Sequence, residues 1–280
     1  MASFKILHIE RTPNNQVLEL LEKNVVGTPG KSILYQLQDV QLKINSISNP
    51  YFANLSIRNR LYGTICLSKR NVYSLNKQHQ AFYLRYFTFR DSFRTTNPKK
   101  HSRKTPSLIR EDVAKLMDGE GLDFNEKLVL YAYVDVDNIR SKRLIDEFGF
   151  RKAGEFSVIA FSRLFPKFDS RVYELESAHQ HVMKSLLLDF YKDERLVATD
   201  NMFERGTYFV FKNNDEIVCG VQAIIDSWGI KEVPGIAGKM MMKIVPKLPL
   251  LNRLFNPHYK FVFLESIYCK AGHEKELEVN

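Results

Sequence analysis

A run of basic side chains is the segment of this sequence best suited to binding chemistry, because it could hold a polyanion. Residues 85–104 contain seven Lys or Arg and a single acid, Asp91. The cations are Arg85, Arg90, Arg94, Lys99, Lys100, Arg103 and Lys104. The last four directly precede Thr105 and Pro106, the residue types of a helix cap and first turn. The cations and the helix dipole would then converge on one anion such as a phosphate. The alternative is a solvated basic loop that binds nothing.

Few other residues suggest chemistry. Asp135 and Asp137 follow an apolar run, where a general base could lie, although such residues more often form turns or helix caps. The seven His are scattered, with His179 and His181 two apart and no cluster of acids or Cys beside them, so no metal site is expected. The sequence contains no GxSxG, Walker A or GxGxxG motif.

The elements that would position a site are clearest between Lys127 and Phe161. In residues 128–136 both the odd-numbered and the even-numbered positions carry apolar side chains, as in a strand that is covered on both faces. Asp135 and Asn138 can stop this strand and cap a short helix. The residues Ser141, Leu144, Ile145 and Phe148 then recur at helical spacing. Gly149 sits where a helix needs a left-handed exit, and a further strand is expected after Phe150.

This order resembles the GNAT superfamily of N-acetyltransferases, whose second half reads strand, N-x-x-A-x-x-L-Y-x-x-x-G-F, strand. The matching positions here are Asn138, Ser141, Leu144, Ile145, Gly149 and Phe150. The resemblance implies a mixed α/β fold (α+β, with a mixed sheet) that binds an acyl-CoA. In many members the Tyr of the motif donates a proton to the departing thiolate. Ile145 occupies that position and has no proton to donate, so the catalytic residues stay unassigned.

The resemblance also places the cofactor. Members pair strand backbone with the pantetheine amides, here along Tyr86, Phe87, Thr88 and Phe89 within the strand expected over residues 82–89. The segment that corresponds to their phosphate loop, residues 94–107, contains no glycine. Cationic side chains would therefore replace backbone amides as phosphate ligands. The predicted cofactor contacts beyond the strand are Arg94, Lys99, Lys100, Arg103, Lys104, Asn138 and Ser141.

The chain is long enough for two cores. Residues 1–164 are predicted to form the GNAT-like domain, with further elements at 4–9 (strand), 15–24 (helix), 33–37 (strand), 62–67 (strand) and 105–117 (helix). A weak internal repeat around Gly63 and Gly220 predicts that residues 165–280 form a second, incomplete GNAT-like unit with an insertion near 229–256. Its open sheet edge would pack on the first domain, pair with another copy in a homo-oligomer, or belong to a longer protein.

Composition limits the partners. The net charge of +9 permits an anionic ligand without selecting one. Three scattered Cys and the lack of a signal peptide or a long apolar run favour a cytoplasmic protein. Residues 235–255 are apolar with spaced cations, so they could cover the sheet, line an acyl cavity or touch an anionic membrane transiently.

The leading prediction is an N-acyltransferase that moves an acetyl or other acyl group from acetyl-CoA or another acyl-CoA to a small-molecule or protein amine. The alternative is a non-catalytic GNAT-like module that binds a protein partner or an anionic ligand. Nucleic-acid binding through residues 85–104 is a third and least favoured prediction.

Overall fold

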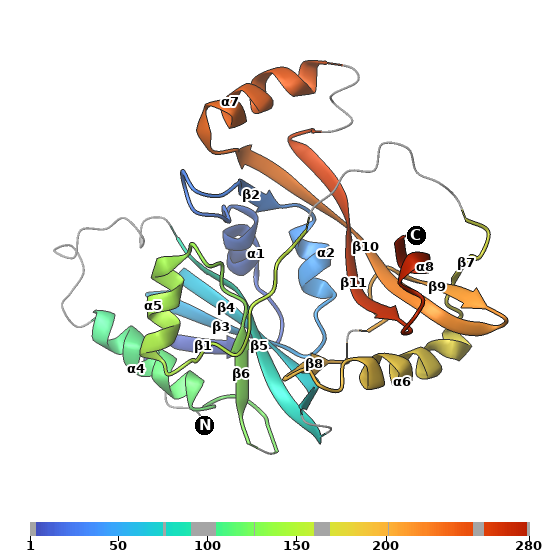
Figure 1. The fold of residues 1–280 in the computed structure, drawn as a ribbon. Helices are drawn as coiled ribbons and strands as arrows, with labels where there is room; N and C mark the ends of the chain where they lie inside the picture. Colours follow the sequence, from blue (N-terminus) through green and yellow to red (C-terminus); the bar gives the residue numbers. More distant parts are fainter. Residues whose placement is uncertain are drawn as a thin grey trace. The chain divides into compact units, whose positions relative to one another are not determined.

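The computed structural model describes residues 4–74, 77–90, 105–125, 127–159, 169–200, 202–248 and 255–278. The chain forms two compact units, each assembled from separated segments (Figure 1). The first unit comprises Met1–Arg70, His79–Lys152 and Trp228–His258. The second comprises Asn71–Gln78, Ala153–Ser227 and Tyr259–Asn280. The predicted division at residue 164 and the predicted repeat stay predictions.

The first unit is built on a mixed sheet with the strand order β1-β3-β4-β5-β6. These strands are β1 (Leu7–Glu10), β3 (Pro50–Ile57), β4 (Arg60–Ser74), β5 (Lys77–Phe89) and β6 (Val129–Ala132). Strand β3 runs antiparallel to both β1 and β4, whereas β5 and β6 run parallel. A parallel pair needs a crossover, and the helix α4 (Thr105–Met117) lies in the connection between β5 and β6. The predicted mixed α/β class is confirmed.

Two apolar layers cover opposite faces of this sheet, because alternate strand residues point to opposite sides. Helices α1 (Asn15–Glu22) and α2 (Val40–Asn45) pack with Phe52 and Cys66 on one face. On the other face Leu116 of α4 packs with Phe82 and Leu84 of β5. Figure 1 shows α4 beside α5 (Ile139–Glu147), and an ion pair of 3.1 Å between Arg110 and Glu147 joins these helices.

A buried carboxylate fixes α4 on the edge of the sheet. Asp112 is fully buried, and its two oxygens accept hydrogen bonds from three successive backbone N–H groups at the start of β1. The donors are Lys5, Ile6 and Leu7, with N···O distances between 2.7 and 3.1 Å. The bond from Leu7 is buried and those from Lys5 and Ile6 are partly buried, so Asp112 serves N–H groups that water reaches incompletely.

A late segment of the chain completes the first unit. The end of β10 (Glu216–Glu232) pairs antiparallel with β2 (Leu34–Leu37), confirming the strand predicted at 33–37. The rings of Tyr35 and Trp228 stack with centroids 4.0 Å apart across this pair. The helix α7 (Gly235–Ile244) and a short 3₁₀ turn, Val245–Lys247, then lead towards β11.

The second unit contains an antiparallel sheet in the order β11-β10-β9-β7. Its remaining strands are β11 (His258–Cys269), β9 (Thr207–Asn213), β7 (Val172–Glu174) and β8 (Val197–Ala198), which pairs with the end of β4. Its helices are a 3₁₀ turn (Ser177–His179), α6 (Gln180–Phe190) and α8 (Glu274–Glu278). Met183 and Leu187 of α6 pack against Tyr208 and Val210 of β9. Asn214 and Asp215, with left-handed φ angles of 48° and 64°, form the tight turn of the hairpin between β9 and β10.

The strand predicted after Phe150 is wrong for the residues that are described there. Residues 151–159 form no strand, and Phe156, Val158 and Ile159 are 66–83% exposed. A strand needs a neighbour to pair its backbone groups, and an apolar sequence alone does not provide one. The expected strand over residues 128–136 is also shorter than predicted and ends at Ala132.

No helix within the described ranges is both long and apolar enough to pass through a lipid bilayer.

Candidate functional site

The two parallel strands of the first unit separate partway along their length. Strands β5 and β6 pair over four positions, from Ala81 opposite Val129 to Leu84 opposite Ala132. Strand β6 then ends, while β5 continues to Phe89. Among the strands that the structure describes, none pairs with residues 85–89 on the β6 side. We call this end of the β5–β6 pair, where β5 continues without a described partner strand, the wedge. A ligand that enters here could meet main-chain groups of β5.

A backbone irregularity marks the start of this wedge. Tyr86 has φ of 55°, a left-handed conformation that costs a non-glycine residue about 1–3 kcal/mol. A residue of this kind inside a strand is typical of a bulge, which bends the strand and changes the direction of its side chains. The Tyr86 ring packs against the α1/α2 core, and its hydroxyl accepts a 2.9 Å hydrogen bond from the Arg85 guanidinium. The bend and the end of β6 together shape the wedge.

Tyrosine and arginine side chains gather on the α1/α2 side of the wedge. The rings of Tyr83 and Tyr131 stack across the strand pair at 5.0 Å, and Tyr133 meets both rings edge-on at 5.4 and 6.1 Å. The guanidinium of Arg70 lies 4.9 Å from the centre of the Tyr83 ring, and that of Arg85 lies 5.6 Å from it. We call these five residues the tyrosine–arginine cluster.

Burial raises the pKa of two phenols of this cluster, Tyr83 and Tyr131. Burial raises the pKa of Tyr131 to about 12, although Arg70 acts in the opposite direction. Burial also raises the pKa of Tyr83, against the influence of Arg85. A phenol with an ordinary pKa of about 10 is already neutral near pH 7, and the raised pKa extends this neutral, proton-donating form to higher pH. Among the described residues, the Arg85 guanidinium contacts the rings of Tyr83 and Tyr86 and the Tyr86 hydroxyl, and it pairs with no carboxylate.

The predicted cofactor contacts on β5 are at the wedge, but their side chains differ in accessibility. Thr88 is buried and donates a 2.7 Å hydrogen bond to the side chain of Asn24, so only its backbone could meet a ligand. Phe87 is partly exposed and meets Phe89 edge-on at 5.0 Å. The ring of Phe89 lies so close to Gly63 that a Cβ there would be 2.4 Å from it.

Asn138 and Ser141 have the capping geometry that the sequence predicts. The side-chain oxygen of Asn138 accepts a 3.0 Å hydrogen bond from the backbone N–H of Ser141, and α5 begins at the next residue, Ile139. Gly149 ends the helix with φ of 79°. Asp135 forms the turn before the cap, since its carboxylate accepts from the N–H of Asp137 at 2.9 Å. A cofactor contact at Asn138 or Ser141 stays a prediction.

The remaining predicted contacts lie outside the described residues. These are Arg94, Lys99, Lys100, Arg103 and Lys104. Arg90, the last described residue before them, donates a 2.6 Å hydrogen bond to the carbonyl of Leu61.

Sequence reasoning missed most of the tyrosine–arginine cluster. Tyr131 and Tyr133 are two residues apart in an expected strand and so share a face, which was a readable signal. Their approach to Tyr83 required the parallel register of β5 and β6, which no local pattern supplies. Arg70 comes from a third strand and gave no signal.

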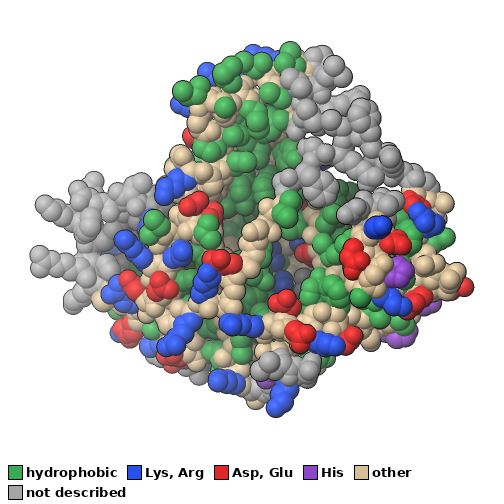
Figure 2. Space-filling model, in the orientation of Figure 1, with side chains coloured by type: hydrophobic (Ala, Val, Ile, Leu, Met, Phe, Trp, Pro, Cys, Tyr) green, Lys and Arg blue, Asp and Glu red, His purple; other side chains and the backbone are tan. Residues whose placement is uncertain are grey.

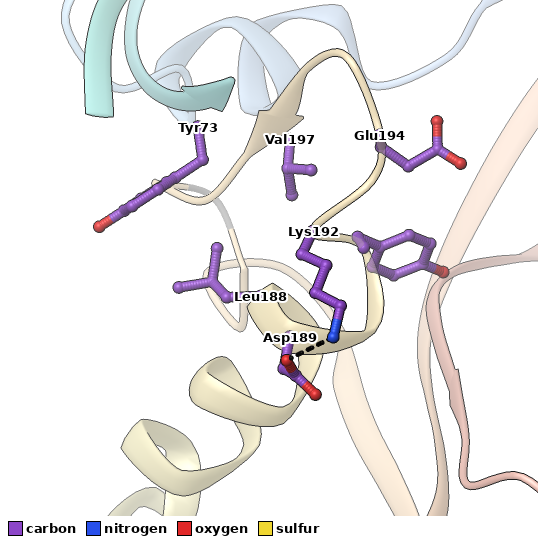
Figure 3. A pocket seen from close by; sticks show the side chains of 7 residues that line it. Tyr73, Leu188, Asp189, Lys192, Glu194 and Val197 are labelled. Atoms are coloured by element: carbon purple, nitrogen blue, oxygen red, sulfur yellow. Dashed lines mark hydrogen bonds and ion pairs between the residues drawn. The ribbon is translucent and has the colours of Figure 1, made fainter. Parts of the chain in front are cut away.

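A separate pocket of about 300 Å³ lies in the second unit (Figure 3). Leu188 and Asp189 of α6 face Val197 and Tyr73 across it, and the Asp189 carboxylate pairs with Lys192 at 3.2 Å. The Lys192 ammonium of this pocket is held in the ion pair with Asp189, and the predicted cofactor contacts on β5 lie elsewhere, so we place the candidate site at the wedge instead. The described ranges also contain no group of three or more His, Cys, Asp or Glu side chains that could hold a metal ion.

Comparisons with known proteins give similarity of structure but not of sequence. No known protein-family pattern matches the chain. No curated protein sequence matches it either.

Several solved structures align with parts of this chain, each with a TM-score below 0.5. Saccharomyces cerevisiae N-myristoyltransferase with bound myristoyl-CoA aligns over 85% of this chain, with 8% identity and a TM-score of 0.47. This chain spans 64% of the length of that enzyme. An Enterococcus faecalis V583 protein described as a "probable N-acyltransferase" aligns over 93% of this chain and 65% of its own length, with 9% identity and a TM-score of 0.42. A "possible acetyltransferase" from Clostridium difficile 630 aligns over 57% of this chain and all of its own, with 10% identity and a TM-score of 0.35.

Proposed function

We propose that this chain transfers an acyl group from an acyl-CoA to an amine at the wedge between β5 and β6. The observation that carries the proposal is the separation of these strands after Leu84 and Ala132, with Tyr86 in a left-handed conformation beside it. No described strand lies beside residues 85–87 on the β6 side, so an extended ligand that carries amide groups could pair with their backbone. The pantetheine arm of CoA is such a ligand, and the GNAT resemblance implies that it binds there.

Alignment of the thioester and the amine would supply most of the rate enhancement. Pairing with β5 would hold the thioester of the ligand at a fixed position in the wedge. An amine bound beside it would then react in an effectively unimolecular step. The amine must be neutral to attack, and its proton is lost to a base or water as the new amide forms. The departing thiolate must gain a proton or a hydrogen bond.

Tyr133 is the residue best placed to donate that hydrogen bond in this chain. Tyr133 is the first residue after β6, and Arg85 is the first residue of β5 beyond the last β5–β6 pair, Leu84 and Ala132. The Tyr133 side chain is 60% exposed. Tyr131 is packed on Tyr83 and is less available. Tyr133 would thus replace the hydroxyl that is missing at Ile145.

Two measurements test the proposal. Calorimetric titration with CoA and acetyl-CoA measures binding, and release of the free CoA thiol in the presence of a panel of amines measures transfer. Replacing Tyr133 by Phe should lower kcat about a hundredfold, since it removes one proton donor, while the affinity for CoA stays unchanged. Tyr173→Phe, at an exposed tyrosine of β7 in the second unit, is the matched control and should have no effect. No binding of CoA at millimolar concentration would refute the proposal.

A non-catalytic module is the second candidate. The aliphatic side chain of Ile145 and the absence of glycine from residues 94–107 favour it, because both depart from the pattern of active GNAT enzymes. Binding of CoA without thiol release for any amine would select this candidate.

A further inference from the structure

One helix of the chain presents an apolar row to solvent. Ile236, Met240 and Ile244 of α7 are four residues apart, so they form a ridge along one side of the helix. Their exposed fractions are 82%, 56% and 46%, and Leu248, four residues further on, is 42% exposed. A short helix in water normally turns such residues inward. The exposed ridge therefore needs a partner outside the described residues of this chain.

A row of lysines runs beside this ridge. Lys239, Lys243 and Lys247 have the same four-residue spacing and are all exposed. No Asp or Glu occurs between Gly235 and Leu248, so the segment carries three positive charges and no negative charge. Figure 2 shows apolar and basic side chains next to one another where Figure 1 places α7. The helix thus presents one surface with two parallel rows.

The opposite side of α7 fixes which face is exposed. Gly238 is buried, and a Cβ on it would lie 2.3 Å from the carbonyl oxygen of Val233. Met241, Met242 and Val245 are half-buried on this side. Rotation of the helix about its axis would bring a larger side chain into the space at Gly238. The ridge and the lysine row consequently stay on the outside.

We propose that α7 docks the protein on an anionic phospholipid surface. The apolar ridge would enter the boundary between headgroups and acyl chains, while the lysines bury their methylene stems and keep their ammonium groups at the phosphates. The proposal is independent of acyl transfer at the wedge, because it concerns other residues and another ligand.

The composition of the face favours lipid over a folded protein. Its side chains are Ile, Met, Leu and Lys, none of which is a strong hydrogen-bond acceptor. Protein interfaces usually add directional polar contacts and aromatic anchors, which this face lacks. A fluid bilayer requires only apolar area and complementary charge. The Met side chain also adapts readily to an irregular surface.

Co-sedimentation of the full chain with vesicles tests the proposal. Binding is expected to vesicles of phosphatidylcholine with phosphatidylserine, and little or none to phosphatidylcholine alone. Replacing Lys239, Lys243 and Lys247 by Gln should weaken partitioning roughly a hundredfold, since each cation near an anionic surface contributes about fivefold. Met240→Glu should abolish binding, because it puts a negative charge into the apolar ridge.

A control triple tests whether net charge alone explains the result. Lys31, Lys127 and Lys142 are exposed and lie far from α7 in the sequence, and their replacement by Gln should leave binding nearly unchanged. Circular dichroism checks that every variant stays folded. The proposal would be overturned if the protein bound both kinds of vesicle equally or bound neither. It would also be overturned if the α7 triple variant and the control triple variant lost binding to the same extent. Self-association that Met240→Glu removes, without vesicle binding, would overturn it in favour of a second copy of the chain.

Discussion

Replacing Asp112 by Asn should destabilise the protein more than almost any other change of one polar atom. The Asp112 carboxylate is fully buried and accepts from the N–H groups of Lys5, Ile6 and Leu7 at 2.7–3.1 Å. The Asn amide has the same shape but only one acceptor oxygen, and its NH₂ group would face at least one of these donors. The Asn oxygen can take the place of Oδ2, which accepts from all three donors, but the NH₂ group then faces the Lys5 N–H in place of Oδ1. All three hydrogen bonds also exchange a charged acceptor for a neutral one, which costs about 1 kcal/mol each. We expect a total loss of about 3 kcal/mol in the free energy of unfolding.

The neighbouring residue provides a matched control. Glu111 lies on the same helix and pairs with the Lys5 side chain at 2.8 Å, but both side chains are about half exposed. Its replacement by Gln should change stability by about 0.5 kcal/mol or less, because exposed ion pairs contribute little. Urea unfolding followed by circular dichroism measures both variants. Equal effects of the two substitutions, or an Asp112→Asn effect within error of zero, would refute the argument from burial.

Asp112 also links stability to the candidate site. It anchors α4, whose first turn directly follows the basic residues 94–104. If these residues bind the phosphates of CoA, loosening α4 should weaken CoA binding, while Glu111→Gln should leave it unchanged.

Three further outcomes are expected. Gly63→Ala places a Cβ 2.4 Å from the Phe89 ring, so it should cost about 1–3 kcal/mol in urea unfolding. Burial raises the pKa of Tyr131 to about 12, above the value of about 10 in an unfolded chain. Its contribution to stability is therefore complete below about pH 10 and is lost as the pH rises through about 12, which tyrosinate absorbance of wild type and Tyr131→Phe can follow. A hydrogen bond from Arg171 lowers the pKa of Asp169 to about 2. The stabilisation of the folded state by ionised Asp169 is therefore complete above about pH 4 and is lost as the pH falls through about 2. Nuclear magnetic resonance titration of the Asp169 carboxyl should show this midpoint and its return to about 4 in Arg171→Gln.

Local signals in the sequence predicted local structure well. The Asn138 cap and the left-handed exit at Gly149 were both readable, because each depends on residues within one helix turn. The hairpin at Asn214 and Asp215 follows from the same kind of rule, since both residues tolerate positive φ.

Features that depend on distant partners were not readable. The apolar residues 156–159 predicted a strand, yet no strand pairs with them in the described structure. The tyrosine–arginine cluster combines three strands, and its register came only from the pairing of β5 with β6. The predicted phosphate contacts, residues 94–104, lie outside the described residues and still rest on the resemblance alone.

The interleaving of the two units constrains how the chain can fold during synthesis. The first unit includes Trp228–His258, whose leading residues pair with β2 near the amino terminus. Domains built from one continuous segment can fold one after another as they leave the ribosome. Here the early portion stays incomplete, because β2 lacks its partner strand β10 until most of the other unit has been translated. We expect nascent chains halted before residue 228 to bind holdase chaperones, and chains released beyond residue 258 to escape them.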